Sequence, residues 1–195
     1  LADEIYGELR YEGDPVSIAA LPGMRERCIF LHGFSKAFAM TGFRLGFACA
    51  PAPLVEAMMK IHQYTMLCAP TLSQEAAIEA LNEPERDVEP MREEYRARRN
   101  FLLRAFGEIG LPVIEPRGAF YMFPYVGHLG VSSREFALKL LEEERVAVVP
   151  GEVFGPTGSG HVRCSYATAM DQLEEAARRI GAFVARHASV CRATV

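Results

Sequence analysis

Short apolar runs separated by prolines and glycines dominate the first part of the chain. Compact runs at residues 27–32 and 45–50 predict two buried strands, and the chain opens at what reads as the end of another strand. Residues 8–27 are rich in turn residues and predict a loop with one short helix. Apolar residues at helical spacing predict helices over residues 53–62 and 72–81, the second capped by Thr71. This alternation indicates part of an α/β sheet domain ending near residue 85.

The remainder of the chain predicts a smaller α+β domain. Charged residues 83–94 include two prolines and predict a hinge into a long helix over residues 91–109, which Gly110 and Pro112 terminate. The further predicted elements are short strands at 113–114 and 119–125, a helix capped by Ser132 or Ser133 and ending near Glu144, strands at 146–149 and 161–166 around a glycine-rich loop, and an amphipathic helix over 171–187.

Composition narrows the class of protein. The 195 residues are 50% hydrophobic and 24% charged with a net charge of -4, which is ordinary for a globular protein. The sequence lacks a dense basic patch and an apolar run of bilayer length, so neither nucleic acid nor a membrane is an expected partner. Because the chain opens at Leu1, inside a strand end, we expect it to be a piece of a longer protein.

The cysteines point to a reducing compartment. Their number is odd and their spacing is not that of metal ligands, which is typical of reduced thiols in a cytosol. Each is expected to be a small buried apolar residue rather than a nucleophile. They are Cys28, Cys49, Cys68, Cys164 and Cys191.

The stretch from residue 34 to residue 46 carries the most distinctive chemistry. It places Lys36 among phenylalanine and methionine residues directly after a predicted strand, with Arg44 further along. Desolvation favours a neutral lysine amine, which forms Schiff bases with carbonyl compounds. Pyridoxal 5'-phosphate (PLP) is the commonest cofactor that needs such a lysine, together with an acidic partner for its pyridine nitrogen. Asp3 is the candidate partner, because open α/β sheets bind ligands at the carboxyl ends of their strands.

Taken singly, these residues also have structural interpretations. Asp3 fits a turn residue at a strand end, Lys36 a lysine at a helix start, Arg44 an ordinary ion pair, and Arg163 a charge on a strand face. The residues that we expect to be structural or solvated are His32 and His161, the packing residues Tyr121 and Tyr166, and the long-helix arginines Arg92, Arg96, Arg98 and Arg99.

Taken together, in this order and spacing, the motifs resemble those of one family. They are Asp3-x-x-Tyr6, Ser35-Lys36-x-Phe38-x-Met40-x-Gly42-x-Arg44-x-Gly46, Gly118-Ala119-Phe120-Tyr121, Pro150-Gly151-x-x-Phe154-Gly155 and Val162-Arg163-Cys164-Ser165-Tyr166-Ala167. Through essentially its whole length the chain resembles the class I/II aminotransferases of PLP fold type I, most of all the aspartate-aminotransferase-like branch.

The resemblance implies both a fold and a reaction. It implies an α/β fold in which residues 1–85 are the C-terminal part of a PLP-binding large domain with a mostly parallel sheet, and residues 86–195 are a small α+β domain. It also implies a cytoplasmic homodimer that moves an amino group between an amino acid and a 2-oxo acid. The implied site residues are Lys36 as aldimine lysine and general base, Asp3 on the pyridine nitrogen, Tyr6 on the ring's 3' oxygen, Ser35 and Arg44 on the phosphate, and Arg163 on the substrate α-carboxylate.

The chain departs from the family pattern in two respects. Many members carry a phosphate-binding serine where this chain has Gly33, and the family's phosphate loop, ring-stacking aromatic and asparagine precede the position of Leu1. Two alternatives therefore stay open: another fold type I enzyme such as a C–S β-lyase, and a non-catalytic isolated fragment. A group for the substrate side chain has no clear candidate, since Arg117 is expected to be solvated.

Overall fold

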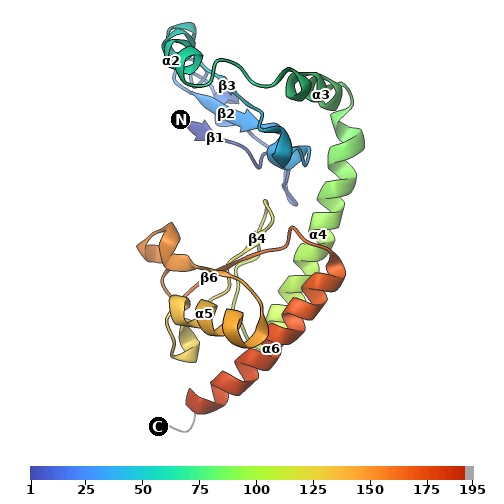
Figure 1. Ribbon diagram of the computed structural model, residues 1–195, viewed down its shortest axis with the longest axis vertical. Coiled ribbons are helices and arrows are strands. Elements are labelled where there is room, and N and C mark those ends of the chain that lie inside the picture. Colours follow the sequence, from blue (N-terminus) through green and yellow to red (C-terminus); the bar gives the residue numbers. More distant parts are fainter. Residues whose placement is uncertain (192–195) are drawn as a thin grey trace. The chain divides into compact units, whose positions relative to one another are not determined.

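The computed structural model describes residues 1–191, with side chains described as far as His187 (Figure 1). The chain divides into two compact units, Leu1–Glu93 and a second that begins at Glu94, so the boundary falls inside one long helix. Among the described residues, the helices are all too short or too polar to cross a bilayer.

The first unit contains a small mixed sheet. Its strands are β1 (Ala2–Asp3), β2 (Phe30–Gly33) and β3 (Gly46–Cys49), in the order β1-β2-β3. β1 pairs with β2 in parallel, whereas β2 pairs with β3 in antiparallel orientation. The expected mostly parallel sheet is therefore not observed, because residues 34–45 return the chain from β2 to β3 on the adjacent strand in antiparallel orientation and do not cross over the sheet. The prediction of a buried strand is wrong for β3, an edge strand whose residues are exposed.

Three short helical segments and two longer helices connect and extend this sheet. They are η1 (Ile18–Ala20), α1 (Phe34–Ala37), η2 (Thr41–Phe43), α2 (Ala52–Thr65) and α3 (Thr71–Asn82). The two predicted longer helices, α2 and α3, are confirmed, but Pro70 is the cap of α3 and Thr71 is its first helical residue. Proline suits this position because its missing N–H leaves no helical hydrogen bond unmade.

A single helix, α4 (Pro84–Ile109), replaces the predicted hinge and shorter helix. Pro84 stands at the first helical position, where a proline costs little. Pro90 lies inside α4 and removes one intrahelical bond, yet the helix continues through it. Buried apolar residues on both sides stabilise it, with Val88 in the first unit and Phe106 in the second. Its end is as predicted: Gly110 has φ +84°, and the Leu111 N–H donates to the Phe106 carbonyl.

The second unit has an antiparallel sheet in the order β4-β6-β5. Its strands are β4 (Tyr121–Met122), β5 (Val149–Pro150) and β6 (Val162–Ser165), so all three are shorter than the strands predicted there. Residues 113–114 form no strand, because the flanking Pro112 and Pro116 limit both the hydrogen bonding and the backbone conformation. Short η segments, Gly127–Leu129, Gly151–Phe154 and Pro156–Gly158, occupy the connections.

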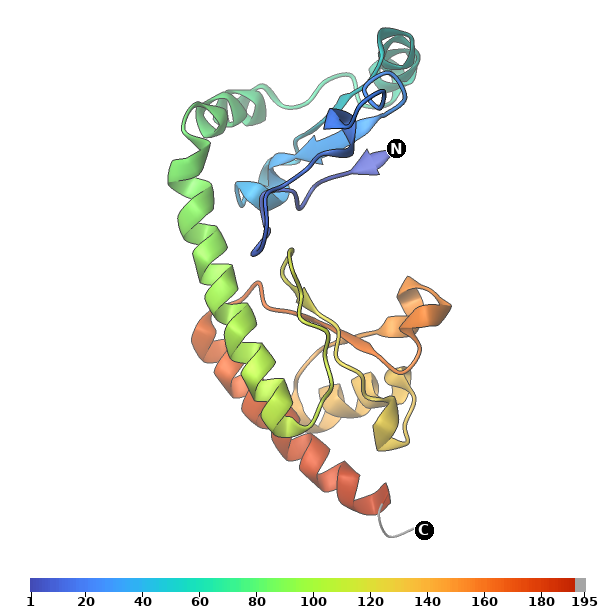
Figure 2. The same ribbon diagram turned by 180° about the vertical axis from the view of Figure 1, so that it is seen from behind.

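Two further helices close the core of this unit. They are α5 (Ser133–Glu144) and α6 (Met170–Cys191), which pack together through Phe136 and Phe183 at 5.2 Å between ring centroids. The predicted inward face of α6 is confirmed, since Leu173, Ala177, Ile180 and Val184 are all buried. Figure 2 shows α6 running beside the later part of α4, where the backbone of Gly181 approaches the Ile109 side chain.

Candidate active site

The first unit brings three predicted site residues to one edge of its sheet. Asp3 pairs with Leu31 in the parallel β1–β2 ladder, so the carboxyl ends of both strands meet at this edge. Lys36 follows at once in α1, and Gly46 of the returning strand pairs with Gly33, which places Arg44 just before the same edge. Asp3 and Arg44 are exposed and Lys36 is half-buried. A carboxylate, an amine and a guanidinium therefore share one sheet edge.

The segment after β1 is a series of tight turns. The Ile5 N–H donates to Asp3 Oδ1 at 3.2 Å, which orients the carboxylate. The Gly7 and Leu9 N–H groups donate to the carbonyls of Glu4 and Tyr6, at 2.8 and 3.0 Å. Leu9 is fully buried and anchors the series, so the half-buried Tyr6 lies on a segment fixed at both ends.

Hydrogen bonds link Arg44 to the residue before Lys36. The Arg44 Nη1 donates to the Thr41 carbonyl at 2.9 Å, and Thr41 Oγ1 donates to the Ser35 carbonyl at 2.8 Å. Arg44 has φ +54°, a left-handed conformation that non-glycine residues seldom adopt away from functional sites and turns. The sequence argument missed Thr41, although a threonine beside Gly42 is a usual turn residue that bonds nearby backbone.

The apolar neighbours of Lys36 face helix α3. Phe34 and Met40 are buried and pack in one cluster with Ala77 of α3. Ser73 of the same helix is also buried, and its hydroxyl donates to the Phe43 carbonyl at 2.7 Å. The hydrophobic residues of the stretch therefore fix α1 to the scaffold and leave the lysine side chain partly accessible.

Gly33, the departure from the family pattern, lies in a crowded place. A Cβ atom there would lie 3.1 Å from the Leu45 carbonyl oxygen and 3.2 Å from both Gly46 Cα and Ile5 Cδ1. These contacts are tighter than ordinary packing, so a serine would require the surrounding backbone to shift. The local structure of this chain is thus built around a glycine at the start of α1.

Arg163 belongs to the second unit and lies between two aromatic rings. Its guanidinium carbon is 4.5 Å from the Tyr121 ring centroid and 4.6 Å from that of Phe154. The antiparallel register explains the first contact, because Tyr121 pairs with Ser165 and so is a diagonal neighbour of Arg163. Among the described residues, the buried Nε of Arg163 has no hydrogen-bond partner. The positioning contact of Phe154 was missed, although its motif was recognised.

Close backbone packing supports the segment that presents Phe154. Gly151 and Gly158 meet so tightly that a Cβ on Gly151 would lie 2.1 Å from the Gly158 carbonyl oxygen. Only residues without side chains permit this approach. The glycines therefore close the turn that holds Phe154 near Arg163.

Outside the site, the structure corrects the sequence predictions for some residues and confirms those for others. Arg99 is buried rather than solvated, because Nη1 donates to the Pro116 carbonyl at 3.0 Å and pairs with Glu115. Cys49 and Cys68 are exposed rather than buried, Cys28 is buried, and burial raises the pKa of the Cys164 thiol to about 12. The Cys191 side chain lies outside the described residues. His161 stacks on Phe123 and Tyr166 is fully buried, as expected of structural residues.

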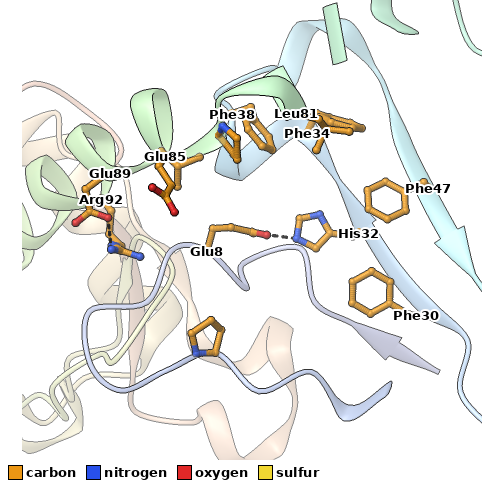
Figure 3. Close-up of a pocket in the computed structure, with 13 residues that line it drawn as sticks. Glu8, Phe30, His32, Phe34, Phe38, Phe47, Leu81, Glu85, Glu89 and Arg92 are labelled. Carbon is orange, nitrogen blue, oxygen red and sulfur yellow. Dashed lines mark hydrogen bonds and ion pairs between the residues drawn. The ribbon is translucent and has the colours of Figure 1, made fainter. Parts of the chain in front are cut away.

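A cavity of about 760 Å³ lies beside the lysine-bearing segment, within the first unit (Figure 3). Its walls are mostly apolar, yet they contain an ion pair: His32 Nε2 lies 2.9 Å from Glu8 Oε2. The hydrogen bond to Glu8 raises the pKa of His32 above its ordinary value. Burial is the largest single influence on the pKa of Glu8 and raises it, but the hydrogen bond and charge of His32 together with a backbone hydrogen bond outweigh burial, so the net effect is a lowered pKa. The sequence argument expected a structural His32 and missed Glu8.

Comparison with known proteins agrees with the geometry. The family described as "Aminotransferase class I and II" matches residues 1–180. A putative aminotransferase of Bacillus subtilis, YugH, is 57% identical and covers 94% of this chain and 48% of its own length. An aspartate aminotransferase of Pyrococcus abyssi is 47% identical, covering 92% of this chain and 47% of itself.

The solved structures give the same result. The aromatic aminotransferase of Pyrococcus horikoshii matches with a TM-score of 0.92 and 46% identity, over 94% of this chain and 50% of that one. The chain thus spans about half the length of the relatives that it matches. Extended agreement in sequence and structure leads to one conclusion: this chain belongs to the class I and II aminotransferase family.

Proposed function

We propose that this chain carries the lysine-bearing side of the active site of a PLP-dependent aminotransferase, which moves an amino group between an amino acid and a 2-oxo acid. The observation that carries the proposal is the meeting of Asp3, Lys36 and Arg44 at one edge of the sheet. On a surface without this function, a carboxylate, an amine and a guanidinium would not be expected together at the carboxyl ends of two parallel strands. PLP needs all three, for its pyridine nitrogen, its aldehyde carbon and its phosphate.

The residues present fit this cofactor. When bound, PLP supplies an electron-withdrawing ring that stabilises negative charge at the substrate α-carbon. Lys36 would hold the cofactor covalently through its amine, and once released its Nζ would take the substrate α-proton and deliver it to the carbon that had been the cofactor's aldehyde. The Asp3 carboxylate accepts a hydrogen bond from the protonated pyridine nitrogen. The remaining contacts that we propose are Tyr6 on the ring's 3' oxygen, and Ser35 with Arg44 on the phosphate.

Arg163 is the proposed group for the substrate α-carboxylate. Its buried Nε lacks a partner among the described residues, and the rings of Tyr121 and Phe154 hold its guanidinium plane. A planar fork held in this way binds a carboxylate through two parallel hydrogen bonds. Because every α-amino acid has this carboxylate, Arg163 favours amino-acid substrates as a class.

We further propose that the natural protein is a homodimer in a reducing cytosol. The cysteines of the described part of the chain whose side chains are placed are all free thiols, which supports that compartment. Helix α2 buries none of its residues and, with the turn after it, exposes large apolar side chains including Ile61, Tyr64 and Leu67. Contiguous exposed apolar residues on a helix are typical of a protein interface.

A panel of amino acids tests the reaction class in the natural protein that carries this sequence. Each amino acid is mixed with the PLP-loaded protein, and the products are identified by mass spectrometry. A 2-oxo acid formed together with pyridoxamine phosphate supports transamination. Pyruvate and ammonia from cysteine-type substrates would instead establish β-elimination, the alternative reaction of this fold.

A further inference from the structure

We propose that Glu8 and His32 form a positioning pair, which ties the segment carrying Asp3 and Tyr6 to the backbone that leads into Lys36. The inference rests on the function proposed above, since it assigns the pair a purpose in holding the two halves of the cofactor site in register. Neither residue is expected to touch the cofactor itself. Figure 3 shows the pair between the loop that carries Glu8 and the strand that carries His32.

Two aromatic rings and two hydrogen bonds hold the His32 ring in place. It stacks between Phe30 and Phe47, with ring centroids 5.8 and 5.6 Å away, and its side chain is only 8% exposed. The Gly33 N–H donates to His32 Nδ1 at 2.7 Å, so in the neutral ring the proton resides on Nε2. That Nε2–H then donates to Glu8 Oε2 at 2.9 Å. The ring therefore bonds both to Glu8 and to the backbone of Gly33, the N-cap residue of α1.

The pair links the segments that follow β1 and β2, beyond the last hydrogen bond between the two strands. The β1–β2 pairing ends at Asp3 and Leu31, followed by the bond from the Glu4 N–H to the Leu31 carbonyl at 2.9 Å. Beyond that point the two segments separate, one toward Tyr6 and the other toward Lys36. Glu8 reaches across to His32 after this separation, and the backbone at Gly7 passes close to the same ring.

Other charges around the ring do not replace Glu8. Those near it are Glu4 on the same loop and Glu85, Glu89 and Arg92 on α4. Glu4 accepts hydrogen bonds from the Ser17 hydroxyl and the Ile18 N–H, and Arg92 is paired with Glu89. Glu85 also lines the cavity, and Figure 3 draws no hydrogen bond or ion pair between it and His32. The side-chain bond that orients His32 is thus the one from Glu8.

The function of such a pair follows from the geometric demands of catalysis. The pyridine-nitrogen partner and the cofactor lysine stand on different segments, and both must contact one rigid ring. Small displacements of supporting residues cost large factors in binding and rate. A bond that joins the two segments beside the sheet edge limits this displacement.

The test uses Glu8→Gln in the natural protein, with Glu85→Gln as a control that removes a charge from the same cavity. The measurements are the His32 pKa by ring NMR, hydrogen exchange at the amides of residues 33–36, and the dissociation constant of PLP. We expect Glu8→Gln to lower the His32 pKa, speed exchange, and weaken PLP binding by up to about fivefold, the effect of one partly exposed charged hydrogen bond. The control is expected to leave the exchange and the dissociation constant unchanged.

Two substitutions of His32 separate positioning from general stability. In His32→Gln the amide nitrogen reaches the place of Nε2 and keeps a donor for Glu8, whereas in His32→Asn the amide reaches only the place of Nδ1. We expect His32→Gln to retain tighter PLP binding than His32→Asn. Equal losses in the two variants, or unchanged exchange and PLP affinity in Glu8→Gln, would overturn the pairing role.

Failure of this inference is distinguishable from failure of the proposed function. Borohydride reduction followed by peptide mapping shows whether PLP is attached at Lys36, whatever the state of the pair. Attachment at Lys36 with no effect of Glu8→Gln rejects the positioning role alone. Absence of attachment at Lys36 in the unsubstituted protein rejects the proposed function, and with it this inference.

Discussion

Lys36 has a reactive amine, and the residues next to it in the sequence determine where that amine lies. The buried Phe34 and Met40 fix the short helix α1, while the lysine between them stays half-buried. Ser35 and Thr41 then connect this helix to Arg44 through hydrogen bonds from side chains to backbone carbonyls. At the scale of single residues, the candidate site is thus positioned mainly by residues that are close in the sequence. Single substitutions are therefore enough to test it.

Replacement of Lys36 by alanine removes both the covalent attachment and the proposed base. We expect Lys36→Ala to abolish the borohydride-fixed adduct and to lower the transamination rate by at least about 10²–10⁴-fold, the usual contribution of a positioned acid–base group. Lys60→Ala, which changes an exposed lysine on α2, is the matched control. A Lys36→Ala protein that still forms a fixed adduct and turns over would falsify the assignment.

Replacement of Arg163 by lysine keeps the charge but removes the planar fork. Since the fork is proposed to bind the α-carboxylate, Arg163→Lys should raise the KM for amino acids about tenfold or more. PLP affinity should not change, because Arg163 has no proposed contact with the cofactor. A lowered PLP affinity with an unchanged KM would place Arg163 in a different role.

At the scale of elements, the start of α5 shows that two adjacent serines can have different structural roles. Ser132 caps α5, and its hydroxyl accepts a hydrogen bond from the Glu135 N–H at 3.1 Å. The next residue, Ser133, is fully buried, and among the described residues its hydroxyl lacks a partner. The sequence predicted a serine cap here without separating the two candidates.

These adjacent serines provide a matched pair of substitutions. We expect Ser132→Ala to lower the free energy of unfolding by about 1 kcal/mol, because it removes a cap. Ser133→Ala should be neutral or slightly stabilising, since it removes a buried hydroxyl that makes no bond. Urea denaturation of the two variants measures both effects. The reverse order of stabilities would show that Ser133 is the functional cap.

Helix α4 and the strands show where element prediction fails. Two prolines predicted a hinge, but packing of Val88 and Phe106 at either side sustains one continuous helix. Conversely, the β-branched stretch at residues 146–149 pairs only at its end, in β5. Amphipathic helices such as α6 are predicted well because their repeat is long, whereas strand pairing depends on residues far away in the sequence.

At the scale of the molecule, the Glu8–His32 pair gives stability that depends on pH. The raised pKa of His32 means that its charged form stabilises the fold below about pH 6.5, and this contribution is lost as the pH rises through the folded pKa. The lowered pKa of Glu8 means that its contribution is present above about pH 4.5 and is lost as the pH falls through its folded pKa.

The two limits define a window for measurement. The difference in unfolding free energy between the unsubstituted protein and Glu8→Gln should be largest near pH 5–6 and shrink on either side. It should stay below about 1 kcal/mol, because the Glu8 side chain is 41% exposed and screened by solvent. A difference that does not vary between pH 4 and pH 9 would contradict the ion pair.

The proposed dimer predicts an effect of charge on α2. Met59 on α2 and Leu138 on α5 are equally exposed, each at 52%. We expect Met59→Glu to shift the natural protein from dimer toward monomer in analytical ultracentrifugation, and Leu138→Glu to leave its mass unchanged. Dissociation caused by Leu138→Glu instead would move the interface to the second unit.

Short spacings and residue chemistry were enough to predict the family motifs, the helices α2, α3, α5 and α6, and the residues proposed for the site. The strand directions, the continuity of α4, the burial of Arg99 and the bond between Glu8 and His32 could be established only from the folded chain. Each of these depends on contacts between segments that are distant along the chain, or on packing that offsets a local preference. A pattern of neighbouring residues contains no information about such contacts, so the fold had to supply it.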